Sequence, residues 1–95
     1  MKNQSIKNNW QRFIKLCSRS HNEQELSMLF DLFLTKAEQE DIALRYNIIT
    51  ELLSGKKTQR EIAKEFHVSI AKITRGSNAL RITDQKIKKI IDNIS

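Results

Sequence analysis

The residues most capable of covalent chemistry are a single cysteine and two histidines. Cys17 lies one helical turn before His21, and a thiol beside a histidine base is the pairing that nucleophilic catalysis requires. A lone cysteine among apolar neighbours is far more often a small packing residue, and that interpretation is favoured here. One cysteine also excludes an intramolecular disulfide and a cysteine-based zinc cluster. His67 stands alone and is interpreted as a turn residue rather than a metal ligand.

The acidic residues that lie closest together are typical of a helix start rather than of an acid–base pair. Glu38, Glu40 and Asp41 fall in the first turns of a predicted helix, where the helix dipole favours negative charge. The chain contains two glycines in total, and neither belongs to a phosphate-binding loop. We therefore expect no catalytic residue, no metal site and no enzymatic activity.

A different kind of chemistry is indicated by Arg75 and the glycine that follows it. Gly76 falls inside a predicted helix, where glycine costs about 1 kcal/mol relative to alanine. Another helix could pack closely against it, the helix could end there, or a flat ligand could lie against the backbone. In the last case the neighbouring Arg75 suits a carboxylate on that ligand.

The charge distribution points to a polyanion as a partner. The 95 residues include 17 Lys and Arg against 11 Asp and Glu, which gives a net charge of +6. Residues 58–82 alone carry five basic and two acidic residues. A basic bias concentrated in one segment is typical of nucleic-acid binding, although many surfaces carry a similar excess by chance.

The length and composition predict one small helical domain. The chain has no proline and two glycines, a composition that argues against a β-sandwich or a loop-rich scaffold. The N-terminus is polar and no apolar run is long enough for a signal peptide or a membrane span. We expect a soluble cytoplasmic protein without membrane contact. A chain of this size buries only about 60–65% of its unfolded surface, so dimerisation would add stability.

Apolar residues recur at helical spacing along the whole chain, and no stretch alternates as a strand would. The expected helices cover approximately 7–22, 26–33, 36–54, 59–66, 70–80 and 84–95. Capping residues precede four of them: Thr35 (with Glu38), Thr58 (with Glu61), Ser69, and either Thr83 or Asp84. Gly55 is placed to accept the left-handed turn that ends the third helix. The apolar face expected for that helix is Ile42, Tyr46, Ile49 and Leu53.

The first two helices carry more large apolar side chains than two short helices can bury between them. They are Trp10, Phe13, Ile14, Leu26, Met28, Leu29, Phe30, Leu32 and Phe33. Most of these residues would form an ordinary core, but their number favours a core shared between two chains.

Residues 59–78 match the helix-turn-helix pattern position by position. Ile62 and Phe66 are expected to face inward from the first helix, and Ile73 from the second. Ala63 is small at the point where two helices must cross steeply. His67 occupies the turn position where glycine is commonest, because the turn favours a positive φ that histidine tolerates less readily.

The second helix of this motif would expose small and polar residues: Ser69, Ala71, Lys72, Thr74 and Arg75. Small residues at a helix start let the backbone approach base edges, while lysine and threonine reach bases or phosphates. Helix-turn-helix pairs also occur in modules that only bind proteins. Such a module would lack the salt-dependent DNA affinity that the basic segment otherwise predicts.

Three stretches of the chain resemble the Trp repressor family. They are Ile73-Thr74-Arg75-Gly76-Ser77-Asn78, Thr58-Gln59-Arg60-Glu61 and Glu51-Leu52-Leu53-x-Gly55. The similarity extends without gaps to Leu34-Thr35 and more loosely to Trp10-x-x-Phe13, so it covers most of the chain. It implies an all-α fold of six short helices that forms an intertwined homodimer. Within it, residues 7–54 would form the dimerisation core, 58–82 the DNA-reading head and 84–95 a C-terminal helix.

The resemblance also implies a ligand, L-tryptophan, acting as a co-repressor between core and head. Carried over by matching positions, Arg45 and Arg75 would sandwich the indole, and Arg75 and Thr35 would hold the carboxylate. The carbonyls of Leu32 and Leu34 from the other chain would accept from the ammonium. Ile49 and Gly76 would line the indole slot, and Ala79 would lie beside the amino group. No other cofactor is implied.

The same resemblance implies contacts with double-stranded operator DNA. The residues at the matching positions are Gln59, Arg60, Ser69, Ile70, Ala71, Lys72, Thr74 and Arg81. The implied function is tryptophan-dependent repression of genes for tryptophan biosynthesis or uptake, with tryptophan setting the spacing of the two recognition helices.

Three positions depart from the family pattern. Ala79 replaces a serine whose hydroxyl helps to hold the amino group, a contact worth about 0.5–1.5 kcal/mol. Tyr46 is bulkier than the usual aliphatic residue, and Lys72 replaces a common threonine. These departures keep an alternative open, in which a DNA-binding regulator responds to another ligand or to none.

Overall fold

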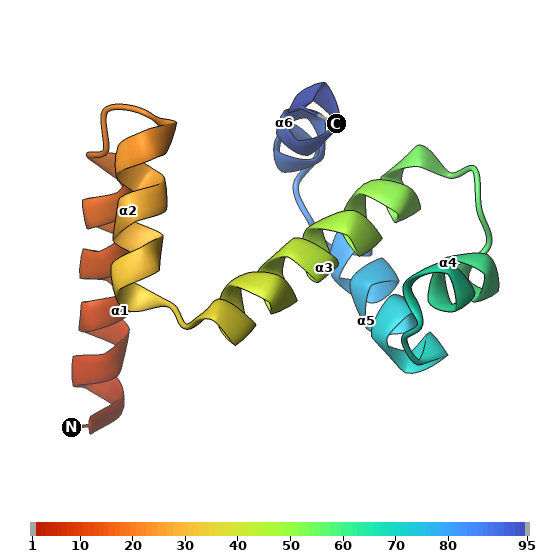
Figure 1. The fold of residues 1–95 in the computed structure, drawn as a ribbon, viewed down its shortest axis with the longest axis horizontal. Coiled ribbons are helices and arrows are strands. Elements are labelled where there is room, and N and C mark those ends of the chain that lie inside the picture. Colours follow the sequence, from red (N-terminus) through yellow and green to blue (C-terminus); the bar gives the residue numbers. More distant parts are fainter. Residues whose placement is uncertain (1, 95) are drawn as a thin grey trace. The chain divides into compact units, whose positions relative to one another are not determined.

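The computed structural model describes residues 2–94, with side chains from residue 5 onward, and its regular elements in that range are all helices (Figure 1). Its helices are α1 (Lys2–Ser18), α2 (Glu23–Phe33), α3 (Lys36–Ser54), α4 (Gln59–Phe66), α5 (Ile70–Arg81) and α6 (Gln85–Ile94). This confirms the predicted all-α class. None of the helices in the described range is long and apolar enough to cross a membrane. The chain divides into two compact units, residues 1–39 and 40–95.

The first helix differs from the predicted range at both ends. It begins at Lys2 and ends at Ser18 instead of covering 7–22. The early start lies in a polar stretch without apolar periodicity, where each added residue still gains a backbone hydrogen bond. At the other end, the Ser18 and Ser20 hydroxyls donate to the carbonyls of Lys15 and Cys17, at 2.7 and 2.8 Å. These side chains satisfy the last-turn carbonyls and allow the helix to stop.

In the first unit, α1 and α2 lie side by side and meet through aromatic rings (Figure 1). The Phe13 ring packs edge-on against Phe33, with centroids 5.2 Å apart, and stacks with Trp10 at 5.7 Å. None of the described side chains of residues 5–39 is buried. Trp10 and Leu32 are 61% and 76% exposed. Across the side chains that the structure describes, this helical pair therefore encloses no core.

In the second unit, a small core holds the helix-turn-helix together. Its buried members are Ile48, Ile62, Ala63 and Ile73, with Leu44, Leu52, Phe66 and Val68 packed against them. Ile62 and Ile73 have no exposed surface. The inward positions predicted for the helix-turn-helix are therefore confirmed.

The face that α3 buries is a correction to the sequence-based expectation. Ile42 and Tyr46, expected on the apolar face, are 51% and 44% exposed, whereas Ile48 is 4% exposed. Ile48 belongs to a second apolar stripe, about a third of the way around the helix from the first, that also includes Leu44 and Leu52. Because α3 carries two such stripes, periodicity alone does not say which one meets the helix-turn-helix.

Both predicted left-handed positions are found. His67 ends α4 with φ 56° and ψ 44°, and its N–H donates to the carbonyls of Ala63 and Lys64. Gly55 follows α3 with φ 67°. The chain thus turns tightly after α3 and again after α4. The second turn brings α4 and α5 together.

Candidate ligand pocket and nucleic-acid interface

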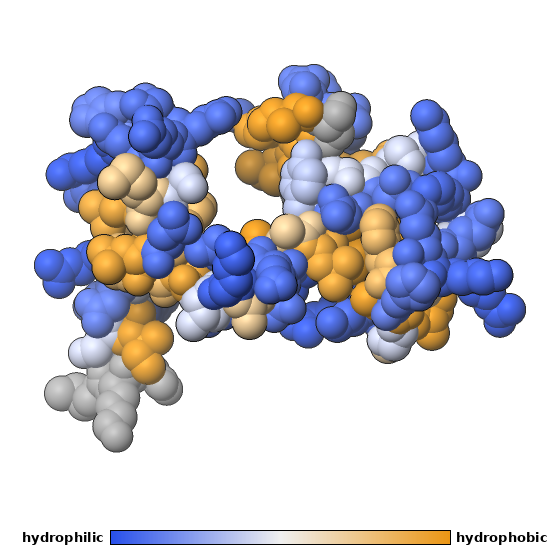
Figure 2. Space-filling view, in the orientation of Figure 1, coloured by the Kyte–Doolittle hydropathy of each residue, from blue (hydrophilic) through white to orange (hydrophobic). Residues whose placement is uncertain are grey.

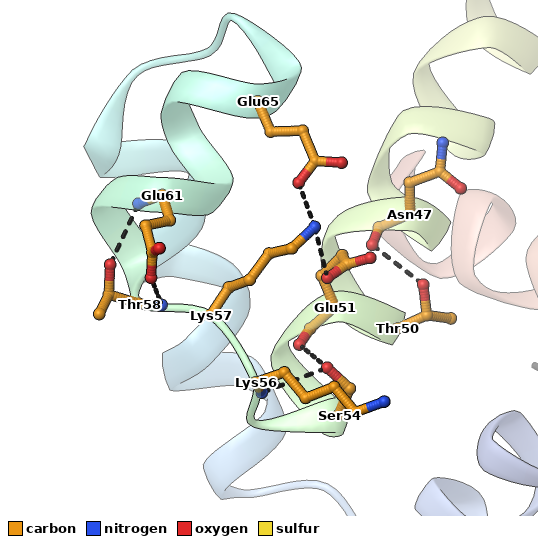
Figure 3. A network of polar contacts seen from close by, with 9 residues as sticks. All are labelled: Asn47, Thr50, Glu51, Ser54, Lys56, Lys57, Thr58, Glu61 and Glu65. Atoms are coloured by element: carbon orange, nitrogen blue, oxygen red, sulfur yellow. Dashed lines mark hydrogen bonds and ion pairs between the residues drawn. The ribbon is translucent and has the colours of Figure 1, made fainter.

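The loop before α4 is fixed by a polar network that Figure 3 shows at close range. Thr58 and Glu61 form a capping box: the Glu61 N–H donates to the Thr58 hydroxyl (3.1 Å) and the Thr58 N–H to the Glu61 carboxylate (2.8 Å). These bonds lower the pKa of Glu61, the backbone N–H of Thr58 contributing most. The start of α4 is therefore tied to its own first turn.

Lys57 joins this loop to two helices. Its ammonium lies 2.5 Å from the Glu65 carboxylate on α4 and 3.4 Å from that of Glu51 on α3 (Figure 3). The hydrogen bond to Glu65 raises the pKa of Lys57, and the negative charge of Glu51 adds to the effect. Through Lys57, these ion pairs connect α4 to the C-terminal part of α3.

The second helix of the motif begins as predicted. The Ser69 hydroxyl accepts from the Lys72 N–H at 3.3 Å and caps α5. Ile70, Ala71, Lys72 and Thr74 are all exposed along the helix. The helix therefore presents its first turns, with their backbone and short side chains, to the outside.

A hydrogen bond connects α4 and α5 at the candidate DNA-binding surface. The Thr74 hydroxyl donates to the Gln59 side-chain oxygen (3.0 Å) and lies 3.1 Å from the Ile70 carbonyl. Arg60 is exposed beside Gln59. At the far end of α5 the Arg81 guanidinium donates to the Asn78 side chain. The predicted DNA-binding residues thus lie on α4, on α5 and at the cap between them.

A pocket of about 230 Å³ opens between α3 and α5. Its lining comes from two stripes of the same spacing, i, i+3, i+4 and i+7: Asp41, Leu44, Arg45 and Ile48 on α3, and Lys72, Arg75, Gly76 and Ala79 on α5. Each stripe is one face of a helix. In Figure 2, orange hydrophobic surface in this unit is bordered by blue hydrophilic surface. The pocket therefore combines an apolar wall with charged side chains.

At Gly76 the backbone of α5 comes close to side chains of α3. A Cβ at this position would lie 3.3 Å from the Leu52 Cδ1 atom, 3.5 Å from the Ile48 Cγ2 atom and 3.6 Å from the Ile49 Cδ1 atom. The close packing considered for this glycine is therefore present. The same residue also lines the pocket, so the ligand interpretation and the packing interpretation apply together.

The predicted ligand residues fall into two groups. The first group lines this one pocket and consists of Arg45, Arg75, Gly76 and Ala79. Ile49 contacts the position of Gly76 but does not line the pocket. Leu32, Leu34 and Thr35 belong to the other unit. There the Thr35 hydroxyl accepts from the Glu38 N–H at 3.1 Å in the capping box predicted for α3.

Four lining residues were missed as ligand residues by sequence reasoning. Asp41, Leu44 and Ile48 share the stripe of Arg45, and their spacing from it was the signal that could have found them. Lys72, predicted to contact DNA, also lines the pocket. Among the described residues, no group of three or more His, Cys, Asp or Glu could hold a metal ion.

The chain is similar in sequence to known proteins along almost its whole length. The family model described as Trp repressor protein matches residues 8–95. A Trp operon repressor homolog of Chlamydia trachomatis serovar D is 52% identical over 91 residues, covering 96% of each chain. One of Chlamydia caviae is 44% identical over 95 residues, covering 100% of this chain and 94% of the relative. One of Vibrio parahaemolyticus is 36% identical over 90 residues, covering 90% of this chain and 87% of the relative.

Proposed function

Because the chain belongs to the Trp repressor family, we propose that it represses transcription by binding operator DNA when L-tryptophan occupies the pocket between α3 and α5. The family is one of DNA-binding regulators, not of enzymes. The genes proposed as targets are those of tryptophan biosynthesis or uptake, in keeping with the name of the relatives. Such a regulator would act in the cytoplasm, where its operator lies.

The observation that carries this proposal is the convergence of Arg45 and Arg75 on one pocket beside Gly76. Guanidinium groups stack on aromatic faces and form paired hydrogen bonds with carboxylates. An indole ring between the two arginines would use the first property, and the carboxylate of the same ligand would use the second. Glycine leaves room for a flat ring against the backbone of α5.

The position of the pocket supports a link between ligand and DNA. Its walls are α3 and the helix that carries Ile70, Ala71, Lys72 and Thr74. A ligand shifts a conformational equilibrium only if it binds one state better than the other. A ligand that contacts both walls would favour one angle between α5 and α3, and this angle sets where the DNA-binding residues point.

The homodimer is part of the proposal. The helical pair α1–α2 buries none of its described side chains and exposes Trp10, Ile14 and Met28 at 61%, 49% and 63%. Large exposed apolar patches mark interfaces, and a second copy of the chain offers the same apolar faces. Leu32 and Leu34 of that copy would bring their carbonyls to the ligand's ammonium. Residues 7–54 would then be the dimerisation core.

Ala79 supports a second candidate function. It lines the pocket with a methyl group where the family pattern has a hydroxyl, so one contact to the amino group of tryptophan is missing. A DNA-binding regulator that responds to a different ligand, or to none, would tolerate this change. Binding of the DNA without tryptophan would favour that alternative.

A gel-shift titration on a palindromic Trp-operator-like DNA tests the proposal, with and without about 1 mM L-tryptophan, enough to saturate micromolar sites. Tighter binding with tryptophan, abolished by Arg75→Ala, is the expected result. Equal binding in both conditions would retain the DNA-binding function and reject tryptophan as the ligand. Absence of specific, salt-dependent binding in either condition would reject the DNA function on this operator.

A further inference from the structure

The pocket between α3 and α5 contains one carboxylate among three cationic side chains. Asp41 faces the same cavity as Arg45, Lys72 and Arg75. Over the part of the chain that the structure describes, the Asp41 carboxylate forms no hydrogen bond or ion pair with another residue, and neither do the guanidinium groups of Arg45 and Arg75. Charged groups that share one cavity without partners are available to a ligand that carries both signs of charge.

The position of Asp41 in α3 is not explained by the helix dipole. The dipole favours carboxylates within the first turn and weakens beyond it. Glu38 lies in that turn and takes part in the capping box with Thr35. Asp41 is the sixth residue of α3 and falls on the stripe that lines the pocket. The helix-start interpretation therefore holds for Glu38 but not for Asp41.

Asp41 carries the one side chain of the lining that can accept a hydrogen bond. The remaining lining side chains are aliphatic or cationic, namely Leu44, Arg45, Ile48, Lys72, Arg75 and Ala79, and Gly76 has none. Lysine and arginine have donors but no acceptor. An ammonium group entering this pocket would meet repulsion from the cations and a single attractive side chain, the Asp41 carboxylate.

We propose that Asp41 binds the ammonium group of an aromatic L-amino acid in this pocket and makes the site select the zwitterion over its deamino analogue. The inference rests on the proposed function, because it deepens what the ligand pocket recognises. The arginines would hold the carboxylate of the ligand and Asp41 its ammonium through a charge-assisted hydrogen bond. Asp41 thereby supplies the acceptor that the methyl group of Ala79 lacks.

The role of Asp41 can be tested by comparing how the pocket binds a ligand with an amino group and one without it. Isothermal titration calorimetry on the full chain would compare L-tryptophan with indole-3-propionate, which has hydrogen in place of the amino group. In the Asp41→Asn variant the affinity for L-tryptophan should fall at least about tenfold, the loss expected for one charge-assisted hydrogen bond. The affinity for indole-3-propionate should stay the same or rise, because the variant removes a carboxylate that repels this anion.

Two variants serve as controls. Glu40→Gln removes the same charge one residue earlier on α3, outside the pocket lining, and should change neither affinity. Asp41→Glu keeps the carboxylate and should retain the preference for L-tryptophan. Circular dichroism would establish that all three variants keep the helical content of the wild type.

The outcomes separate this inference from the function on which it rests. If the wild type binds L-tryptophan and Asp41→Asn binds it equally well, the role of Asp41 is wrong while the proposed function stands. If the variant loses affinity for both compounds alike, Asp41 shapes the pocket and does not recognise the ammonium. If the wild type binds neither compound, the proposed function fails and the inference falls with it.

Discussion

At His67 the backbone takes a left-handed conformation that costs a side-chain-bearing residue roughly 1–2 kcal/mol. Its φ of 56° and ψ of 44° lie in the region that glycine enters without this cost. His67→Gly should therefore raise the free energy of unfolding by about 1 kcal/mol relative to His67→Ala. Urea denaturation followed by circular dichroism measures the difference. Equal stability of the two variants would contradict the strain assigned to this turn.

Glu61 predicts a pH dependence of stability. Hydrogen bonds from Thr58 lower the pKa of Glu61 below its ordinary value of 4.5, so the folded state favours the charged carboxylate. A lowered folded-state pKa adds stability above the ordinary pKa, and this contribution is lost as the pH falls through the folded-state value. The stability advantage of the wild type over Glu61→Gln should therefore be full at pH 7 and shrink below about pH 4.5.

Urea titrations of both proteins between pH 3 and pH 7 check this expectation. Glu40→Gln is the matched control, since Glu40 lies outside both capping boxes. A wild-type advantage over Glu61→Gln that stays constant across the range would show that the carboxylate does not carry the capping energy.

Among the elements, α5 has two roles, because its Gly76 both packs against α3 and lines the pocket. In Gly76→Ala the helix gains about 1 kcal/mol in propensity, and Leu52 must move slightly from a contact of 3.3 Å. The two effects oppose each other, so stability should stay within about 1 kcal/mol of the wild type. Affinity for L-tryptophan should fall about tenfold or more, because the methyl group narrows the slot between the helices.

Calorimetry with L-tryptophan and thermal unfolding on the same samples separate these two effects. Ser77→Ala places an alanine one residue further along α5, outside the pocket lining, and should bind as the wild type does. Unchanged affinity in Gly76→Ala would mean that the ring of the ligand does not lie against this part of α5.

For the whole molecule, none of the described side chains of the α1–α2 pair is buried, so we expect the chain to fold as a dimer. Ile14→Glu should shift the species seen by analytical ultracentrifugation toward the monomer and lower the melting temperature, since a charge would enter an apolar interface. Lys15→Glu, on the adjacent exposed position, should leave the dimer intact. The melting temperature of the wild type should also rise with protein concentration.

A monomeric wild type whose melting temperature is independent of concentration would contradict the dimer. In that case the exposed apolar faces of α1 and α2 would need a different partner. The ligand contacts proposed for Leu32 and Leu34 would also lose their basis, because both depend on a second copy of the chain.

The sequence alone was enough to predict six helices and most of their ends; the exceptions are both ends of α1 and the start of α2. Capping boxes at Thr35 and Thr58, the cap at Ser69 and the left-handed residues at Gly55 and His67 are local signals, since each depends on neighbours within about one helical turn. The inward-facing residues of the helix-turn-helix could also be predicted, because helical spacing is likewise a local property of the sequence. The first helix was misplaced because its polar start carries no apolar period and its end depends on serine hydroxyls.

Only the tertiary structure decided which face of α3 meets α5. Both apolar stripes of α3 satisfy the helical period, and the choice of Ile48 over Ile42 depends on contacts with residues far along the chain. That choice also places Asp41 in the pocket and gives Gly76 its packing role. Residue spacing records which side chains share one helix face, whereas packing between helices determines which two faces enclose a site.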